Sequence, residues 1–282
     1  MYILFFFFVI FLSLFIMLVS NVFFWWGVFL VMTLLIVFMN KKIMSYSSIF
    51  NYFVLQESLG LVFLLLFFSF FPVLIMMIKI GIAPFHFWLF KVVSGMYSFN
   101  LVWFLTIHKL PFLLVFLQLF FLNIVFLLLV GMLLCLFQLF VMKSFKSMLV
   151  ISSVESFNWV LVSLSMSFFN VFYLIFYYLF LMMFLIYKFD VVGNLGTGFS
   201  WELVLVFMNM PFSLGFFIKI MMLMEFLKGF GIYMILIMMM MFMSILSLNF
   251  WLMILSSKMY MFNKYNVVSV MYVFPLMMLV LL

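Results

Sequence analysis

Long apolar runs separated by short polar stretches dominate the sequence, with no regular alternation of apolar and polar positions. An apolar run of about 20 residues crosses a bilayer as a helix, whereas a membrane strand alternates. Backbone groups in hydrocarbon must be satisfied within their own segment, which also favours helices over open strands. We therefore predict an all-α fold: a polytopic transmembrane bundle forming a single domain, 1–282.

The boundaries of the expected helices fall at polar residues, glycines and prolines. The first run is interpreted as a helix and not as a signal peptide, because it has no basic start and no small-residue cleavage site. About eleven helices are expected, covering approximately residues 1–19, 22–39, 49–70, 72–92, 99–121, 123–141, 147–168, 170–187, 201–228, 231–255 and 266–282.

The lysines in the connections are distributed asymmetrically. Connections after odd-numbered helices contain only Lys228, and those after even-numbered helices contain Lys41, Lys42, Lys91, Lys143, Lys146, Lys188, Lys258 and Lys264. An excess of lysine on one side of the membrane is what the positive-inside rule describes. It places the N-terminus on the lysine-rich side and the C-terminus on the opposite side.

Composition further narrows the kinds of protein that this chain can be. Hydrophobic residues make up 73% of the chain and charged residues only 6%, whereas soluble domains are roughly half apolar and about a quarter charged. These values exclude a soluble fold, a disordered chain and a nucleic-acid binder. The single Cys135 forms no intrachain disulfide and no metal cluster. All 12 basic residues are lysines, so the bidentate forks by which arginine binds phosphate or carboxylate are absent.

Three lysines, Lys79, Lys109 and Lys219, lie well inside apolar runs and have no role in topology. A charge at the bilayer centre costs at least about 2.5–3.5 kcal/mol, so such residues usually face a protein interior or a wet cavity. Burial disfavours the charged form of a lysine, which allows it to exchange a proton. The alternative is that each flexible stem carries its ammonium group to the membrane surface.

Each of these lysines has a proline nearby: Pro84, Pro111 and Pro211 respectively. A proline inside a helix breaks it, and broken helices place polar backbone beside ion paths in transporters. The alternative is that prolines are simply common in membrane helices. An Ile-Lys-Ile tripeptide surrounds both Lys79 and Lys219, in the fourth and ninth expected helices. Those helices run in opposite directions, as in an inverted repeat.

Glu57 and Glu155 are candidate lysine partners or proton carriers, with a position near the membrane surface as the alternative. His86 and His108 are candidate relays, or histidines satisfied within the interior. Two histidines are too few to ligate two haems in pairs. The glycine-rich stretch 193–198 has no lysine and no strand context, so it does not predict a nucleotide-binding loop.

Residues 77–88, MIKIGIAPFHFW, resemble the signature K-[LI]-G-x-A-P-F-H-F-W of subunit 2 of mitochondrial NADH:ubiquinone oxidoreductase, complex I. Other stretches resemble the family in the same order, namely Trp26-Gly27 followed by Lys41-Lys42, Tyr52 to Gln56, Thr106 to Leu110, Lys146 to Trp159, and Pro211 to Phe226. The Phe, Met and Leu richness and the lack of arginine resemble a nematode-type, organelle-encoded member.

The resemblance implies an antiporter-like membrane subunit with two inverted-repeat bundles and broken helices. It implies that Lys79 is the central lysine of the first bundle, Lys109 the bridging lysine and Lys219 the lysine of the second bundle. The family's second-helix glutamate corresponds here to Phe29, and its seventh-helix histidine to Ser156. We therefore hypothesise that Glu57, one helix further along, supplies the missing carboxylate.

The expected function is a core membrane-arm subunit of proton-pumping NADH:ubiquinone oxidoreductase. The expected proton pathway consists of Glu57, Lys79, Lys109 and Lys219, with His86, His108 and Glu155 as candidate relays. The resemblance implies that this chain binds no cofactor, whereas the whole complex uses NADH, FMN, iron–sulfur clusters and ubiquinone.

Expected partners are other membrane-arm subunits, including adjacent antiporter-like subunits, and membrane lipids, with no nucleic acid and no small-molecule substrate. The expected location is the mitochondrial inner membrane, with the N-terminus in the matrix and the C-terminus in the intermembrane space. Two alternatives stay open: a structural subunit that does not conduct protons, and a stand-alone cation/proton antiporter.

Overall fold

The structure is a computed structural model that describes residues 2–41, 46–69, 71–96, 98–119, 124–142, 144–164, 179, 182–183, 214–229 and 234–256. Within these ranges every regular element is an α-helix and no strand occurs, so the all-α prediction is confirmed for the described part. The expected helix 266–282, nearly all of 170–187 and the glycine-rich stretch 193–198 lie outside the described residues.

The chain divides into two compact units, Met1–Gly131 and Met132–Leu282, and each is described by itself. The first contains α1 (Tyr2–Leu18), α2 (Val22–Asn40), α3 (Tyr46–Leu65), α4 (Phe71–Ile80), α5 (Phe87–Val93), α6 (Ser98–Leu105) and α7 (Lys109–Gln118). Helix α8 (Val125–Val141) begins in the first unit and ends in the second. The second unit also contains α9 (Phe145–Leu164), α12 (Leu214–Gly229) and α13 (Met234–Ser256).

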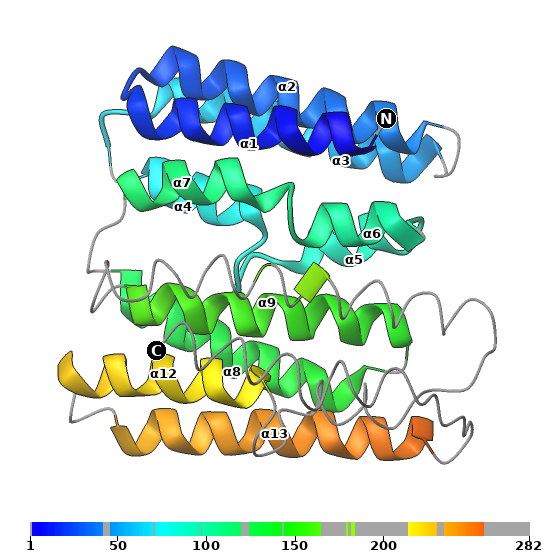
Figure 1. Ribbon diagram of the computed structural model, residues 1–282, viewed down its shortest axis with the longest axis vertical. Helices are drawn as coiled ribbons and strands as arrows, with labels where there is room; N and C mark the ends of the chain where they lie inside the picture. Colours follow the sequence, from blue (N-terminus) through cyan, green and yellow to red (C-terminus); the bar gives the residue numbers. More distant parts are fainter. Residues whose placement is uncertain are drawn as a thin grey trace. The chain divides into compact units, whose positions relative to one another are not determined.

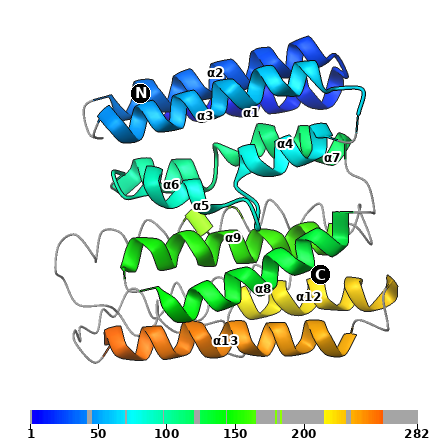
Figure 2. The ribbon, with the colours of Figure 1, turned by 180° about the vertical axis from the view of Figure 1, so that it is seen from behind.

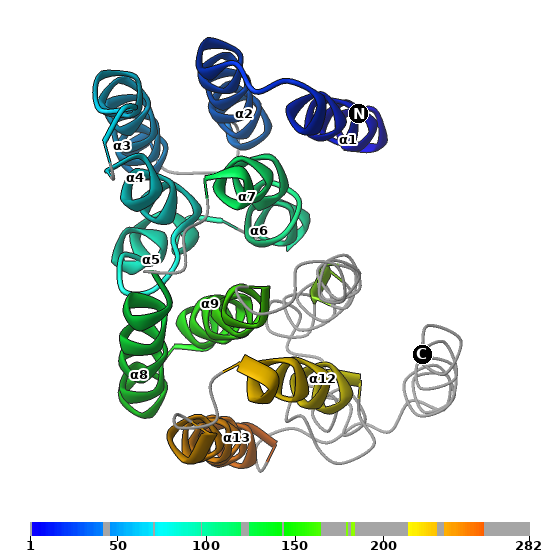
Figure 3. The same cartoon turned by 90° about the vertical axis from the view of Figure 1, so that its left-hand side faces the viewer.

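In the first unit α1, α2 and α3 run side by side (Figure 1), and the end-on view places α2 between the other two (Figure 3). The turn between α1 and α2 is held by side chains. Asn21 caps α2 by accepting a hydrogen bond from the Phe23 amide at 3.0 Å. The Trp25 indole donates to the Val19 carbonyl at 2.8 Å, which satisfies a carbonyl beyond the end of α1.

Four described helical stretches are long and apolar enough to cross a membrane: Val22–Asn40, Tyr46–Leu65, Phe99–Gln118 and Lys146–Leu164. Large apolar side chains point outward from these and the shorter helices, as Phe23, Phe38 and Phe137 do. Polar side chains instead lie in the interior, among them Thr33, Gln56, Lys79, His108, Lys109, Glu155, Asn158 and Lys219. This inverted distribution indicates hydrocarbon as the solvent of the outer faces.

The expected helix 72–92 is found as two segments, α4 and α5, joined by an irregular stretch (Figure 2). Gly81 has a φ of +75°, a left-handed conformation that favours glycine. Its N–H still bonds the Met77 carbonyl at 3.0 Å, and the Ile82 N–H reaches the same carbonyl at 2.9 Å. Pro84 has no N–H to continue the helix, so the chain restarts only at Phe87.

The expected helix 99–121 is also divided, into α6 and α7. At the division the His108 N–H bonds the Trp103 carbonyl at 3.0 Å, a wide turn that replaces the regular α-helical bond. Pro111 lies one turn further on, where its ring excludes the regular helical position of residue 107. The break therefore follows from Pro111, and it places Lys109 at the first position of α7.

A glycine on α8 packs directly against the first break. A Cβ atom added at Gly131 would overlap the backbone carbonyl of Ala83, which cannot rotate away as a side chain can. We expect Gly131→Ala to lower the free energy of unfolding by about 1–3 kcal/mol, the usual cost of overpacking. Gly27→Ala is the matched control, because no atom lies within 4 Å of the added Cβ.

Thermal unfolding of the full-length chain in lipid nanodiscs measures the difference. A lower midpoint for Gly131→Ala with an unchanged or higher midpoint for Gly27→Ala is expected, since alanine has the better helix propensity. Equal midpoints for the two variants would contradict the close packing of α8 on the first break.

Candidate functional site

Lys79 is the centre of a polar site inside the first unit. It lies one residue before the end of α4, and only 2% of its surface is exposed. Its Nζ donates to the Gln56 carbonyl of α3 at 2.9 Å, and the Gln56 Nε2 donates back to the Lys79 carbonyl at 3.2 Å. The two reciprocal bonds fix α3 against the end of α4, where regular helical bonding stops.

Aromatic rings cover the other side of the Lys79 ammonium group. Its Nζ lies 4.7 Å from the ring centroid of Phe29 and 5.7 Å from that of Phe112. These two rings stack on each other with centroids 5.1 Å apart. Cation–π attraction therefore stabilises the charge here. The resemblance places a glutamate of the family at the position of Phe29. Lys79 therefore meets the face of an aromatic ring here, where the family has a carboxylate.

Glu57 lies on the next α3 position after Gln56 and is half-buried. Its Oε1 accepts a hydrogen bond from the Thr33 hydroxyl of α2 at 2.6 Å. Glu57 lies within electrostatic range of Lys79, but among the described residues the two do not form an ion pair. The hypothesis that Glu57 replaces the missing carboxylate therefore stays a prediction, with an interaction through space and not through a direct bond.

His108 and Lys109 lie at the second helix break and are almost fully buried. The His108 Nε2 is 2.9 Å from the Tyr52 hydroxyl of α3, with donor and acceptor set by the imidazole tautomer. The ring stacks on Phe104 at 5.5 Å between centroids. Tyr52 precedes Gln56 by four residues, so one face of α3 contacts both the Lys79 and the His108 sites.

His86 lies in the first break and has no exposed surface. Its ring stacks on Phe87 at 5.0 Å and meets Phe90 edge-on at 5.7 Å. The structure thus places His86 among aromatic rings next to α5, and its assignment as a relay stays a prediction.

The second unit contains a buried ion pair. Lys219 of α12 lies 3.2 Å from the Glu155 carboxylate of α9, with 6% and 2% of the two side chains exposed. The Trp159 indole donates to the same carboxylate oxygen at 2.8 Å, and the Lys219 ammonium donates to the Ser244 hydroxyl of α13 at 3.3 Å. Glu155 is therefore paired with a lysine and buried, and its assignment as a proton relay stays a prediction. Figure 3 shows α9, α12 and α13 together.

Ser156, where the resemblance leads us to expect a histidine, donates to the Ser152 carbonyl of its own helix at 2.6 Å. The sequence assigned no role in the site to Tyr52, Thr33 or Ser244, which contact His108, Glu57 and Lys219 respectively. The signal for Ser244 was available, because hydroxyl groups are rare in the methionine-rich run 231–255. Among the described residues no group of three or more histidine, cysteine, aspartate or glutamate side chains is placed to hold a metal ion.

Apolar helices that enclose lysines, histidines and a glutamate define an α-helical membrane protein with ionisable groups in its interior. No protein-family model matches the chain. It is 46% identical over 232 residues to NADH-ubiquinone oxidoreductase chain 2 of Caenorhabditis elegans, covering 82% of each chain. It is 46% identical over 231 residues to the protein of the same name from Ascaris suum, covering 82% of this chain and 76% of the relative. The chain belongs to the family of NADH-ubiquinone oxidoreductase chain 2.

Membership of this family makes the chain a subunit of NADH:ubiquinone oxidoreductase and confirms the resemblance found in residues 77–88. It also accounts for the lack of any nucleotide-binding motif in the sequence, because one subunit need not contain every site of the enzyme.

Proposed function

We propose that this chain carries a proton pathway through the membrane arm of the enzyme. The proton-exchanging groups are Lys79, Lys109, Lys219 and Glu57, with His86, His108 and Glu155 as relays. Electron transfer from NADH through FMN and iron–sulfur clusters to ubiquinone takes place in other subunits, and this chain binds none of these groups. Its partners are other membrane-arm subunits, adjacent antiporter-like subunits among them, and lipids of the mitochondrial inner membrane, with the N-terminus in the matrix.

The burial of all three lysines is the observation that carries the proposal. Lys79, Lys109 and Lys219 are 2%, 3% and 5% exposed, so none of them places its ammonium group at the surface of the protein. A buried lysine that serves no topological purpose costs free energy. A proton pathway explains why three such lysines are buried despite this cost in free energy.

The surroundings of the lysines suit different steps of proton transfer. Lys79 meets neutral groups, a carbonyl and two ring faces, in a medium of low dielectric. Lys219 instead meets the carboxylate of Glu155. Charges interact strongly in such a medium, so a proton gained or lost at one group changes the proton affinity of its neighbours.

The two inverted-repeat bundles belong to the same proposal. The breaks beside Lys79 and Lys109 resemble the discontinuous helices that line ion paths in transporters. Pro211, the counterpart near Lys219, lies outside the described residues.

A structural subunit that does not conduct protons is the second candidate, and Phe29 is the observation that favours it. A fully buried phenylalanine cannot ionise, and it fills the space beside Lys79. A proton pathway through Lys79 then needs the carboxylate of Glu57, which is hydrogen-bonded to Thr33, to interact with Lys79 through space.

Glu57→Gln separates the two candidates. The amide still accepts the Thr33 hydrogen bond, so assembly should be unchanged while the negative charge near Lys79 is lost. We expect fewer protons pumped per NADH oxidised by the enzyme in reconstituted vesicles, with NADH oxidation by an artificial acceptor unchanged. Glu225→Gln is the control, because that carboxylate belongs to the ion pair with the exposed Lys228. An unchanged ratio of protons to NADH for Glu57→Gln would favour the structural subunit.

A further inference from the structure

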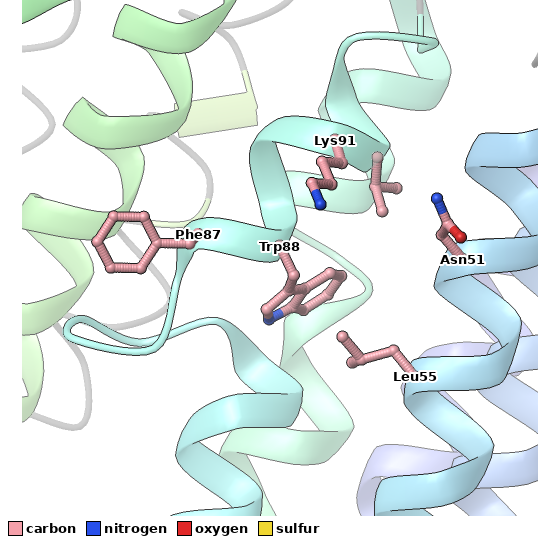
Figure 4. A pocket seen from close by; sticks show the side chains of 6 residues that line it. Asn51, Leu55, Phe87, Trp88 and Lys91 are labelled. Atoms are coloured by element: carbon pink, nitrogen blue, oxygen red, sulfur yellow. The ribbon is translucent and has the colours of Figure 1, made fainter.

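A groove between α3 and α5 lies outside the lysine sites described above. It has a volume of about 380 Å³ and is lined by Asn51, Leu55, Phe87, Trp88, Lys91 and Val92. This volume falls in the range of roughly 300–1,000 Å³ that is typical of small-molecule pockets. Figure 4 shows the groove from close by, with Lys91 on α5 and Asn51 on α3 facing it from opposite sides.

Polarity changes along the groove in one direction. Lys91 and Asn51 lie at one end, and Trp88 and Leu55 lie beyond them in the same view (Figure 4). The spacing on the helices produces this arrangement. Leu55 follows Asn51 by four residues on α3, and Phe87 precedes Lys91 by four on α5, so each helix presents a polar and an apolar residue one turn apart on the same face.

The cation of this groove has no counter-charge within the described part of the chain. Lys91 is exposed and takes part in no ion pair there. The described carboxylates are engaged elsewhere: Glu57 by Thr33, Glu155 by Lys219 and Glu225 by Lys228. An anion bound by Lys91 must therefore come from outside these residues.

We propose that the groove binds one anionic phospholipid. Its phosphodiester lies between the Lys91 ammonium and the Asn51 amide, and an acyl chain lies along Leu55 and the Trp88 ring. Basic pockets between transmembrane helices on the lysine-rich side bind anionic lipid headgroups. The topology derived from the sequence places Lys91 on that side. An apolar helix of another subunit would cover the aromatic end but would leave the Lys91 charge uncompensated.

The lipid would lie next to the first lysine site. The Trp88 indole that forms part of the groove donates to the Ile78 carbonyl at 2.9 Å, directly before Lys79 in the chain. The same ring lies 6.2 Å from that of Tyr52, which bonds His108. Packed aromatic rings therefore connect the lipid groove to the polar interior around Lys79 and His108. The lipid proposal does not depend on proton transfer.

Photo-crosslinking of the full-length chain in nanodiscs tests the proposal. The probes are phosphatidylglycerol and phosphatidylcholine with a photoactivatable group in the acyl chain, and the labelled residues are mapped by mass spectrometry. We expect phosphatidylglycerol to label the Leu55 and Trp88 segments and phosphatidylcholine to label them weakly. Lys91→Gln should reduce labelling by phosphatidylglycerol about fivefold, the effect of one lysine at a membrane surface.

Three further variants sharpen the result. Asn51→Asp supplies an internal counter-charge and should reduce labelling as Lys91→Gln does, whereas Lys91→Arg should retain it. Lys41→Gln is the matched control, because Lys41 is another exposed lysine assigned to the same membrane side but does not line the groove. Equal labelling by the two lipids, wild-type labelling of Lys91→Gln, or absence of labelling at these segments in the purified enzyme would each overturn the proposal.

Discussion

Replacing Lys79 by methionine should abolish proton transfer through this subunit and leave the enzyme assembled. Methionine has a similar length and keeps the contacts with the Phe29 and Phe112 rings, because a thioether packs well against aromatic rings. It loses the bond to the Gln56 carbonyl, which is worth about 1 kcal/mol. A positioned proton-transfer group typically contributes about 100-fold or more to a rate, so the effect on pumping should far exceed the effect on stability.

The measurement is the number of protons pumped per NADH oxidised in reconstituted vesicles, set against the amount of assembled enzyme. Lys79→Arg distinguishes a proton carrier from a fixed positive charge, since arginine keeps the charge and does not release its proton in proteins. Both variants should lower the pumping ratio if Lys79 exchanges protons. Normal pumping by Lys79→Met would show that Lys79 has no role in proton transfer. Normal pumping by Lys79→Arg alone would show that Lys79 acts only as a fixed positive charge.

Much of the fold could be predicted because hydrocarbon imposes a simple length rule. The first two expected helices, 1–19 and 22–39, are found as Tyr2–Leu18 and Val22–Asn40. The polar Asn21 lies between them and caps α2 in the structure. Length and apolarity decide such helices, and neither depends on long-range contacts.

The two helix breaks show the limit of that rule. The expected helices continue through Gly81 and through residues 106–108, because hydropathy averaged over a whole span joins α4 to α5 and α6 to α7. Pro84 and Pro111 signalled that hydrogen bonding must fail nearby. Where the chain restarts depends on tertiary contacts such as that of Gly131 with the Ala83 carbonyl.

The lysines of the candidate site could be found from sequence, but not their partners. A lysine deep in an apolar run is conspicuous by itself. Its partner lies on another helix, as Gln56 does for Lys79 and Glu155 for Lys219. Helices that are apolar all round have no single hydrophobic stripe, so the face turned inward cannot be identified from the pattern. Glu57 illustrates this, because its bond to Thr33 joins residues 24 positions apart.

Breaking the ion pair of the second unit should have the largest effect on stability. Removing one member of a buried pair leaves a charge without its partner and typically costs about 3–5 kcal/mol. Glu155→Gln should show this loss although Lys219 keeps the Ser244 hydroxyl, and Lys219→Met should show it although Glu155 keeps the Trp159 indole. Neutral donors and acceptors offset only part of the cost of a buried charge. The double variant should recover much of the stability, because neither charge remains.

The exposed pair of Glu225 and Lys228 is the internal control for this experiment. Its atoms are closer, 2.6 Å against 3.2 Å for the buried pair, but 63% of the Lys228 side chain is exposed. Because water screens such a pair, Glu225→Gln should cost at most about 1 kcal/mol. A double-mutant cycle on the unfolding free energy of the full-length chain in mixed micelles measures both couplings. A stronger coupling between Glu225 and Lys228 than between Glu155 and Lys219 would mean that distance outweighs burial. Glu155 would then not be the main group that stabilises the buried Lys219.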